Sequence, residues 1–287
     1  MKKIALLLLI SALIVSGCSR QQEAGTVQVK GSDTMVNLAQ AWAEVYAKEH
    51  PDANIIVTGG GSGTGIAALI NGDTDIATAS REMKPQEIEQ AKAKGLDPLE
   101  FTVAQDGLSV IVNPKNSVSK LNTDQLSDIY TGKITNWKQV GGKDAKMVVV
   151  SRDKNSGTHV FFLEHVVRKG KADGPEQFAA SVLMQVSSQA IADEVTQNPN
   201  AIGYVGMGYA DPSKHKALAI AADASAKFIL PTVANVLNGS YPIARPLYMY
   251  TPKEPEGAVK EFIDFVLSDQ GQKIVKEQEF VPIKTAE

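Results

Sequence analysis

The sequence TVQVKGSDTMVNLAQAWAEVYAKEH, at residues 26–50, is the clearest indicator of the architecture of this chain. Its first five residues alternate between polar and apolar side chains, which is typical of a β-strand. The turn Gly31-Ser32-Asp33-Thr34 separates this strand from apolar residues that recur with helical spacing over 34–49 and stop before Pro51. A strand that passes through a glycine and hydroxyl turn into a helix is the repeating unit of α/β proteins.

The same succession continues along the chain and predicts an α/β fold with a mainly parallel sheet. The order of elements fits two α/β lobes joined by crossover strands, with residues 26–107 and 240–287 in lobe 1 and residues 108–239 in lobe 2. Further strands are expected at 54–58, 75–79, 107–113, 147–150, 201–205 and 247–250, and further helices at 66–70, 85–94, 123–130, 158–168, 187–197, 255–267 and 269–277.

The N-terminus predicts export. Two lysines precede an apolar run at residues 4–15, which is too short for a stop-transfer helix, so we expect a signal peptide at residues 1–17. The sequence Val15-Ser16-Gly17-Cys18 resembles a bacterial lipobox, which implies cleavage before Cys18, a diacylglyceryl group on its sulfur and a polar tether over residues 18–25. The alternative is an ordinary signal peptide with an incidental cysteine. Cys18 is the only cysteine, so no intrachain disulfide can form.

Charge and composition narrow the possible partners. The chain has 29 Lys and Arg against 32 Asp and Glu, and removal of Lys2 and Lys3 with the signal peptide leaves a net charge of −5. A mildly acidic chain has no electrostatic footprint for nucleic acid, so we expect no nucleic-acid partner. No second hydrophobic span follows the first. We therefore expect the mature protein to be globular and monomeric, with the lipid as its only attachment to a membrane.

The turn Ser151-Arg152-Asp153-Lys154-Asn155-Ser156-Gly157-Thr158 has the most specific chemistry. Arg152 offers a bidentate fork to an oxyanion, and Ser156, Gly157 and Thr158 add hydroxyls and amides at a helix N-terminus. This combination predicts an anion site. The alternative is an ordinary N-cap with a solvated arginine.

Two other turns have similar chemistry. Ser32 and Thr34 follow the first strand, and Ser62 lies in residues 59–65, where five of seven residues are glycine. So many glycines are costly in conformational entropy unless the backbone must approach something closely. A helix cap and a flexible turn are the alternatives for the two segments. The occurrence of three such turns in one chain favours an anion-binding protein.

Two charged residues are further candidates. Arg81 follows a predicted strand, at the edge where ligands of open α/β sheets bind, although it could be a surface arginine. Asp106 is a carboxylate beside Gly107 and could equally be a turn residue. Hydrogen phosphate needs an acceptor for its proton whereas sulfate has none, so Asp106 is a candidate for discrimination between them.

Enzyme signatures are incomplete. Residues 117–120 and 151–154 match SxxK without a helix start or partner motifs, and residues 60–64 lack the last glycine of GxSxG. Gly132-Lys133 is not followed by the Ser or Thr of a Walker A motif, and the four histidines form no zinc pattern. We therefore expect no enzyme, no cofactor and no metal site.

An ordered set of motifs resembles the bacterial phosphate-binding proteins of the PstS type, from about residue 26 to the C-terminus. These motifs are Gly31-Ser32-Asp33-Thr34-Met35, Gly61-Ser62-Gly63-Thr64-Gly65-Ile66, Ser80-Arg81, Ala104-Gln105-Asp106-Gly107, Gly132-Lys133-Ile134-Thr135-Asn136-Trp137, Ser156-Gly157-Thr158, Ala201-Ile202-Gly203-Tyr204-Val205 and Tyr241-Pro242-Ile243-Ala244-Arg245-Pro246-Leu247-Tyr248.

The resemblance implies a type II periplasmic binding-protein fold that clamps phosphate between two lobes. The phosphate contacts that it implies are Thr34, the Met35 amide, Ser62, Arg152, Ser156, Gly157 and Thr158. This chain departs from many members at Arg81, where they have an aspartate that accepts the phosphate proton. The departure implies that the acceptor has moved to Asp106 or Asp33.

The expected function is capture of inorganic phosphate outside the cytoplasmic membrane and its delivery to an ABC-type permease. A different tetrahedral oxyanion, such as sulfate, molybdate or tungstate, is an alternative ligand. A secreted phosphoryl-transfer hydrolase and a sensory or adhesion role are alternatives from other classes. The sequence leaves open whether the inner or the outer membrane holds the anchor.

Overall fold

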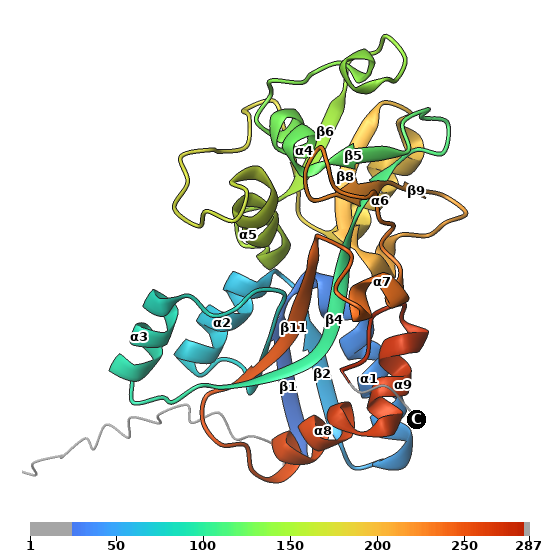
Figure 1. Cartoon of the computed structure of the whole chain (residues 1–287). Helices are drawn as coiled ribbons and strands as arrows, with labels where there is room; N and C mark the ends of the chain where they lie inside the picture. The colour runs from blue at the N-terminus through green and yellow to red at the C-terminus, as the bar shows by residue number, and fades with distance from the viewer. Residues whose placement is uncertain (1–24, 284–287) are drawn as a thin grey trace, which may run out of the picture.

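The parallel strands at the N-terminus are the base of lobe 1, the lower part of the molecule in Figure 1. The computed structural model describes residues 25–283, so the predicted signal peptide and Cys18 lie outside the described residues. Strand β1 (Thr26–Gly31) pairs in parallel with β2 (Asn54–Thr58) and with β3 (Ile76–Ala79). The helices that connect and follow these strands are α1 (Val36–Glu49), α2 (Ser62–Asn71) and α3 (Pro85–Ala93).

Two long antiparallel strands extend the sheet out of lobe 1. Strand β11 (Ala244–Thr251) lies between β3 and β4 (Leu99–Val112). Strand β4 pairs with β11 as far as Gly107 and with β8 (Ala201–Gly206) from Leu108 onward. It therefore runs from one lobe into the other, as Figure 1 shows.

Lobe 2 continues the same sheet. Strand β8 pairs in parallel with β6 (Val148–Arg152), and β6 pairs with β7 (Leu183–Gln185). Within residues 25–283 the strand order is β2-β1-β3-β11-β4-β8-β6-β7. The other elements of this part are β5 (Lys120–Asn122), β9 (Lys216–Ala217), β10 (Ala219–Ala221), α4 (Thr123–Tyr130), α5 (Gly157–Phe162), α6 (Ser188–Gln197) and α7 (Val233–Leu237).

Alternate residues of the strands in lobe 1 pack on opposite faces of the sheet, as the two-residue period of a strand requires. Ile76 and Met249 belong to the core that contains α1, whereas Ala77 and Tyr250 belong to the core that contains α2 and α3. Helices therefore cover both faces, which agrees with the α/β architecture predicted from the sequence.

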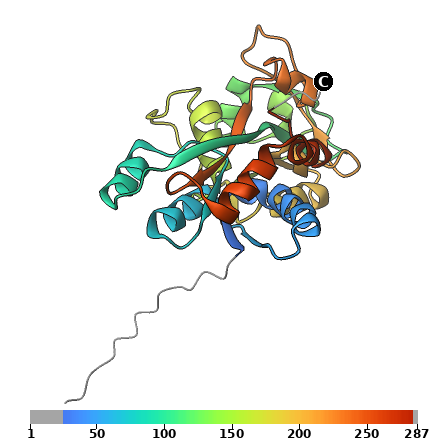
Figure 2. The ribbon, with the colours of Figure 1, turned by 90° about the horizontal axis from the view of Figure 1, so that it is seen from below.

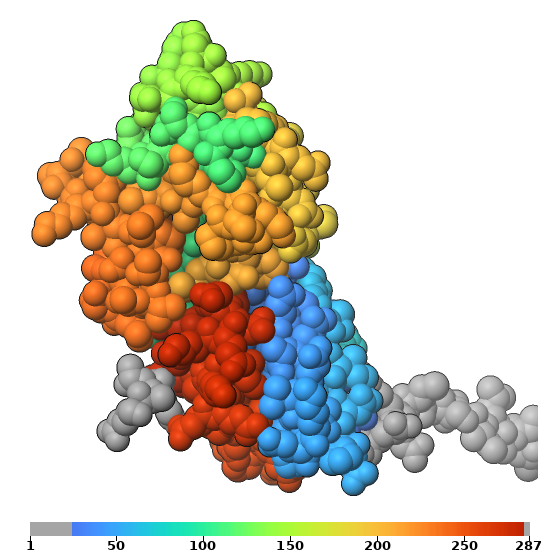
Figure 3. Space-filling view, turned by 90° about the vertical axis from the view of Figure 1, so that its right-hand side faces the viewer, coloured from blue at the N-terminus to red at the C-terminus, as the bar shows by residue number. Residues whose placement is uncertain are grey.

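The C-terminal helices return to lobe 1. Helices α8 (Gly257–Leu267) and α9 (Asp269–Glu277) pack against α1, and Trp42 Nε1 donates a hydrogen bond to the carbonyl of Gly271 at 2.8 Å. Figure 2 shows these red helices beside the blue α1, with α2 and α3 on the other side. In Figure 3 the red and blue segments form one mass, while green, yellow and orange segments form the other.

Aromatic residues fix α5 on the sheet of lobe 2. Phe162 stacks on Tyr204 of β8 with 3.8 Å between ring centroids, and Tyr130 of α4 packs edge-on against Phe162. Aromatic contacts of this kind contribute about 0.5–1.5 kcal/mol beyond the area that they bury. They hold the start of α5, where three predicted site residues lie, in a defined position.

Two predicted element starts differ from the structure by four residues or more. Helix α2 begins at Ser62 rather than at 66, because the glycine-rich turn already forms the first helical turn. Strand β4 begins at Leu99 rather than at 107, because residues 99–106 find a partner in β11, which the sequence separates from them by more than 130 residues. No helix between residues 25 and 283 is both long and apolar enough to cross a bilayer.

Candidate functional site

The carboxyl ends of several parallel strands converge at the junction of the two lobes, where ligands of open α/β sheets bind. Strand β1 ends beside Ser32, β3 ends beside Ser80, and β6 ends at Arg152. The turns that follow these strands come from both lobes. The structure therefore brings together segments that are up to 120 residues apart in the sequence.

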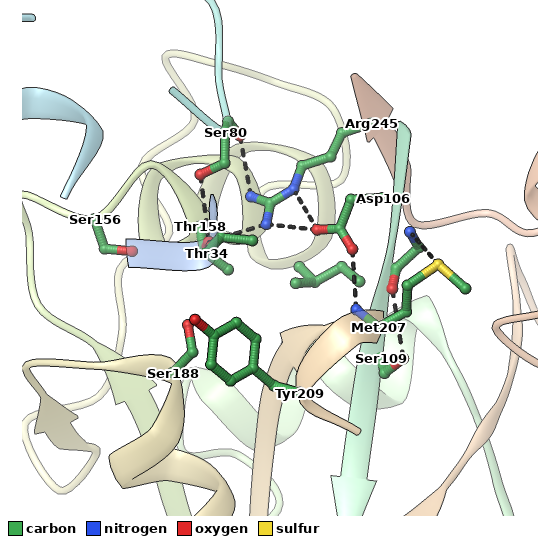
Figure 4. Close-up of polar contacts among 12 residues, drawn as sticks. Thr34, Ser80, Asp106, Ser109, Ser156, Thr158, Ser188, Met207, Tyr209 and Arg245 are labelled. Carbon is green, nitrogen blue, oxygen red and sulfur yellow. Dashed lines mark hydrogen bonds and ion pairs between the residues drawn. The ribbon is translucent and has the colours of Figure 1, made fainter. Parts of the chain in front are cut away.

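Four buried hydroxyl groups meet at this junction, and we call them the hydroxyl cluster: Thr34, Ser62, Ser80 and Thr158. Thr34 Oγ1 and Thr158 Oγ1 are 2.7 Å apart, although they come from different lobes. Ser80 Oγ lies 3.5 Å from Thr158 Oγ1, and the amide of Ser80 donates to Ser62 Oγ at 3.0 Å. Figure 4 shows Thr34, Ser80 and Thr158 gathered around one point.

Two glycines allow the close approach of the lobes. A Cβ on Gly157 would lie 2.2 Å from Ser62 Oγ and 2.7 Å from Ser80 Oγ. Gly61 has a φ of +99°, and a Cβ there would lie 2.6 Å from the carbonyl of Asn155. The amide of Gly63 donates to that same carbonyl at 3.0 Å. Glycine is therefore required by the space available at both positions, and at Gly61 also by the backbone conformation.

An ion pair between Asp106 and Arg245 borders the hydroxyl cluster. Both side chains are almost fully buried, and Arg245 Nη2 lies 2.9 Å from Asp106 Oδ2. Arg245 also donates to Thr158 Oγ1 at 2.9 Å and to the carbonyl of Ser80 at 3.0 Å, so its guanidinium reaches into the cluster (Figure 4). Burial lowers the pKa of Arg245, and the charge of Asp106 opposes this shift. The amide of Met207 donates to the other carboxylate oxygen at 3.0 Å.

A second pair, between Asp33 and Arg152, lies across the lobe junction. Arg152 Nη1 is 2.9 Å from Asp33 Oδ1 and donates to Ser188 Oγ at 2.9 Å. Arg152 Nη2 donates to the carbonyl of Val186 at 3.1 Å. Arg152 Nε is buried and has no hydrogen-bond partner among residues 25–283. One donor of this guanidinium is therefore available to a ligand.

The start of α5 adds further donors. Ser156 is its N-cap, and Ser156 Oγ accepts from the amide of His159 at 3.3 Å. Gly157 and Thr158 are the first two helical residues, whose amides have no acceptor within the helix. The positive end of a helix dipole also favours an anion at this position.

Three predicted site residues, Arg81, Ser32 and Met35, do not belong to the hydroxyl cluster. The Arg81 guanidinium pairs with Glu87, at 2.7 Å, instead of entering the cluster. The amide of Ser32 donates to the carbonyl of Thr78, and the amide of Met35 donates to the carbonyl of Ser32 at 3.0 Å. These two amides therefore hold the turn after β1 and do not point to a common ligand.

A cavity of about 770 Å³ opens beside the cluster. Ser80, Arg81 and Arg245 line it from lobe 1, and Phe161 and Arg168 line it from lobe 2. Both lobes therefore contribute to the walls, which carry four Lys and Arg side chains together with three carboxylates. Arg81 belongs to these walls rather than to the cluster itself.

Sequence reasoning did not single out Arg245 and Ser188. Arg245 stands in an apolar stretch next to a predicted strand, and a charge in such a stretch is a signal for a buried ion pair. Ser188 had no comparable signal, because it is the first residue of an ordinary amphipathic helix. Its hydroxyl accepts a hydrogen bond from Arg152 only because α6 packs against β6.

The chemistry of the site is that of an anion receptor. Hydroxyl groups, helix amides and two arginines supply hydrogen-bond donors, and the two aspartates balance the charge of the arginines. Donors aimed at one buried point favour an oxyanion with several oxygens. Residues 25–283 contain no group of three or more His, Cys, Asp or Glu side chains that could hold a metal ion.

Comparison with known proteins agrees with this geometry. Residues 18–270 match the PBP superfamily domain. The chain is 35% identical over 269 residues to the phosphate-binding protein PstS of Bacillus subtilis, which covers 93% of this chain and 84% of the relative. It is 33% identical over 288 residues to the phosphate-binding protein PstS of Borreliella burgdorferi, which covers 99% of this chain and 100% of the relative.

A solved structure from Clostridium perfringens, described as a phosphate ABC transporter substrate-binding protein with bound phosphate, is similar to this structure. It has a TM-score of 0.80 and 36% sequence identity, and the match covers 90% of this chain and 100% of the other. The fold predicted from the sequence, with two α/β lobes of the type II periplasmic binding proteins joined by crossover strands, is confirmed. The chain belongs to the PBP superfamily and, within it, to the PstS family of phosphate-binding proteins.

Proposed function

We propose that this protein captures inorganic phosphate outside the cytoplasmic membrane and delivers it to an ABC-type permease. The observation that carries the proposal is the convergence of Thr34, Ser62, Ser80 and Thr158 at the lobe junction, with a guanidinium reaching into them. Relatives that cover most of the chain are named phosphate-binding proteins. The protein is accordingly a binding protein and not an enzyme.

In this proposal the hydroxyl groups exchange their bonds to one another for bonds to phosphate oxygens. Thr34, Ser62, Ser156 and Thr158 donate from their side chains, and the amides of Gly157 and Thr158 donate from the start of α5. Arg152 adds its Nε, which is buried and without a partner among the described residues. Ser32 and Met35 act indirectly, because their amides hold the turn that presents Thr34.

The charge balance of the site explains how a buried anion is tolerated. Burial of an unpaired charge costs many kcal/mol, so the energy must come from donors already oriented toward it. The two Arg–Asp pairs contribute no net charge, and they hold both guanidiniums in place. Charge-assisted hydrogen bonds to a phosphate are about twice as strong as neutral ones.

Asp106 remains our candidate for the acceptor of the phosphate proton. It is fully buried and is joined through Arg245 to the hydroxyl cluster, whereas Asp33 lies on the side of Arg152. A carboxylate at this place accepts the P–OH proton of hydrogen phosphate and repels sulfate, which has no such proton. Sulfate, molybdate and tungstate are therefore the competing ligands to test.

A phosphoryl-transfer hydrolase would need a nucleophile with a base. Ser151 Oγ lies 3.5 Å from His159 Nδ1, but that nitrogen is 2.7 Å from the carbonyl of Arg152. Because a carbonyl can only accept, Nδ1 carries the proton and cannot act as a base toward Ser151. The Ser151–His159 pair therefore has a structural role and gives no support to hydrolysis.

We propose that lobe 1 comprises residues 26–107 and 240–287 and that lobe 2 comprises residues 108–239. The change of partner of β4, from β11 at Gly107 to β8 at Leu108, supports this division. We further propose a monomer that is attached to the cell membrane through a lipid on Cys18, after removal of residues 1–17, with residues 18–25 as the tether.

Calorimetric titration tests the proposed ligand and site. We expect the wild-type protein to bind phosphate and to show no heat with sulfate at equal concentration. Gly157→Ala places a methyl group among the hydroxyls of Ser62 and Ser80, so phosphate affinity should fall at least about 100-fold, or roughly 2.7 kcal/mol. Gly257→Ala adds the same methyl at the start of α8, where nothing lies within 4 Å; its φ of +53° should cost some stability, but affinity should stay unchanged. A wild-type protein that ignores phosphate contradicts the proposal.

Asp106→Asn tests the proton acceptor. The variant leaves Arg245 buried without its counter-charge, so we expect a loss of stability of roughly 3 kcal/mol. Its ratio of sulfate to phosphate dissociation constants should shrink by at least about tenfold, or 1.4 kcal/mol. Competition calorimetry measures this ratio, and thermal melting checks that the variant is folded. A folded variant with an unchanged ratio shows that the acceptor is another group.

Cys18→Ser tests the lipid anchor in cells. We expect the wild-type protein in the membrane fraction and the variant in the soluble extracytoplasmic fraction, because one side chain carries the whole attachment. Ser19→Ala, a matched change at the next residue, should leave the protein in the membrane fraction. Equal distribution of the wild type and Cys18→Ser would exclude the anchor.

A further inference from the structure

We infer that Asp33 fastens lobe 1 to lobe 2 and positions Arg152 for the anion. Asp33 lies in the turn after β1, and both partners of its carboxylate, the amide of Ser188 and the guanidinium of Arg152, belong to lobe 2. The inference rests on the proposed function, because it concerns how a captured phosphate is retained. It assigns to Asp33 a role distinct from that of a proton acceptor.

Three segments of lobe 2 meet at this one residue. Asp33 Oδ1 accepts from the amide of Ser188, at the start of α6, at 2.7 Å. The same oxygen lies 2.9 Å from Arg152 Nη1, at the end of β6. The main-chain carbonyl of Asp33 accepts from the hydroxyl of Tyr209, just after β8, at 2.9 Å. One residue of lobe 1 therefore ties together the ends of two strands and the start of one helix.

The ion pair is shielded from water. The side chain of Arg152 is 1% exposed and that of Asp33 is 18% exposed. A charge-assisted bond in such surroundings is stronger than an exposed salt bridge, which contributes little. Burial, followed by the negative charge of Asp33, raises the pKa of Tyr209, so its phenol keeps the proton that it donates.

Asp33 also fixes the direction of the Arg152 guanidinium. Asp33 and Ser188 hold Nη1, and the carbonyl of Val186 holds Nη2. With both terminal nitrogens held, Nε keeps a constant orientation and has no partner among the described residues. Asp33 is thus a positioning residue, which acts on the anion through Arg152.

The fastening is compatible with a bound anion. The contacts of Asp33 use no atom of the hydroxyl cluster, whereas Thr34 and Thr158 contact each other directly. An anion that displaces the contact between Thr34 and Thr158 therefore leaves the bonds of Asp33 in place. The anion then holds the two lobes together on one side of the junction, and Asp33 holds them together on the other side.

The direction in which phosphate affinity changes when the Asp33 carboxylate is removed distinguishes fastening of the lobes from simple repulsion of the anion. A carboxylate near an anion site repels the anion, so its removal alone should speed association and tighten binding. If Asp33 fastens the lobes, its removal should instead speed dissociation and weaken binding. The two mechanisms predict opposite changes in affinity for the same variant.

Stopped-flow binding of phosphate to the full-length protein tests the inference. For Asp33→Asn we expect a dissociation rate at least about tenfold higher, an association rate equal or higher, and a lower melting temperature, because buried Arg152 loses its counter-charge. Asp153→Asn removes a carboxylate from the loop next to Arg152, and its Oδ1 contact is with the amide of Asn155 in the same loop. That control should leave the dissociation rate unchanged.

Tyr209→Phe tests the fastening without a change of charge. It removes the bond to the Asp33 carbonyl and should raise the dissociation rate about two- to fivefold, which also decides the matter if Asp33→Asn does not fold. A dissociation rate that stays the same or falls in these variants overturns the inference. Failure of the proposed function is distinguishable, because then the wild-type protein shows no phosphate binding at all.

Discussion

The burial of polar groups between two lobes is the constraint on which the rest of this structure depends. A hydroxyl or guanidinium removed from water must find a partner, and here each lobe supplies partners for the other. Thr158 of lobe 2 contacts Thr34 and Arg245 of lobe 1, and Asp33 of lobe 1 contacts Arg152. The groups that hold the two lobes together are therefore of the same kind that an oxyanion attracts.

The framework makes this arrangement possible. Strands β4 and β11 connect the lobes, and the parallel strands of the two lobes run in opposite directions, so their carboxyl ends approach the junction from opposite sides. Packing of α1 against α8 and α9, and of Phe162 against Tyr204, fixes the turns at those ends. A receptor whose donors lie at strand ends on two lobes can open to admit a ligand and close to retain it. A receptor with all its donors on one rigid lobe could not do so.

Much of this was predictable from the sequence, and the limits have physical causes. Local patterns identified the strands, the helices and the turns at Thr34, Ser62 and Thr158, because each depends on neighbours in sequence. The pairing of residues 99–106 with β11, and the choice of partner for each arginine, depend on contacts between distant segments. Arg81 was therefore expected at the site and pairs with Glu87, while Arg245 was overlooked and reaches the hydroxyl cluster.

A crystal structure of the protein with phosphate is the most direct test of the central claim, that one buried cluster from both lobes surrounds the anion. We predict phosphate oxygens within hydrogen-bond distance of Thr34, Ser62, Ser156 and Thr158, with both lobes contributing contacts. Phosphate bound on one lobe alone, or in the neighbouring cavity while Thr34 and Thr158 still contact each other, would contradict the account.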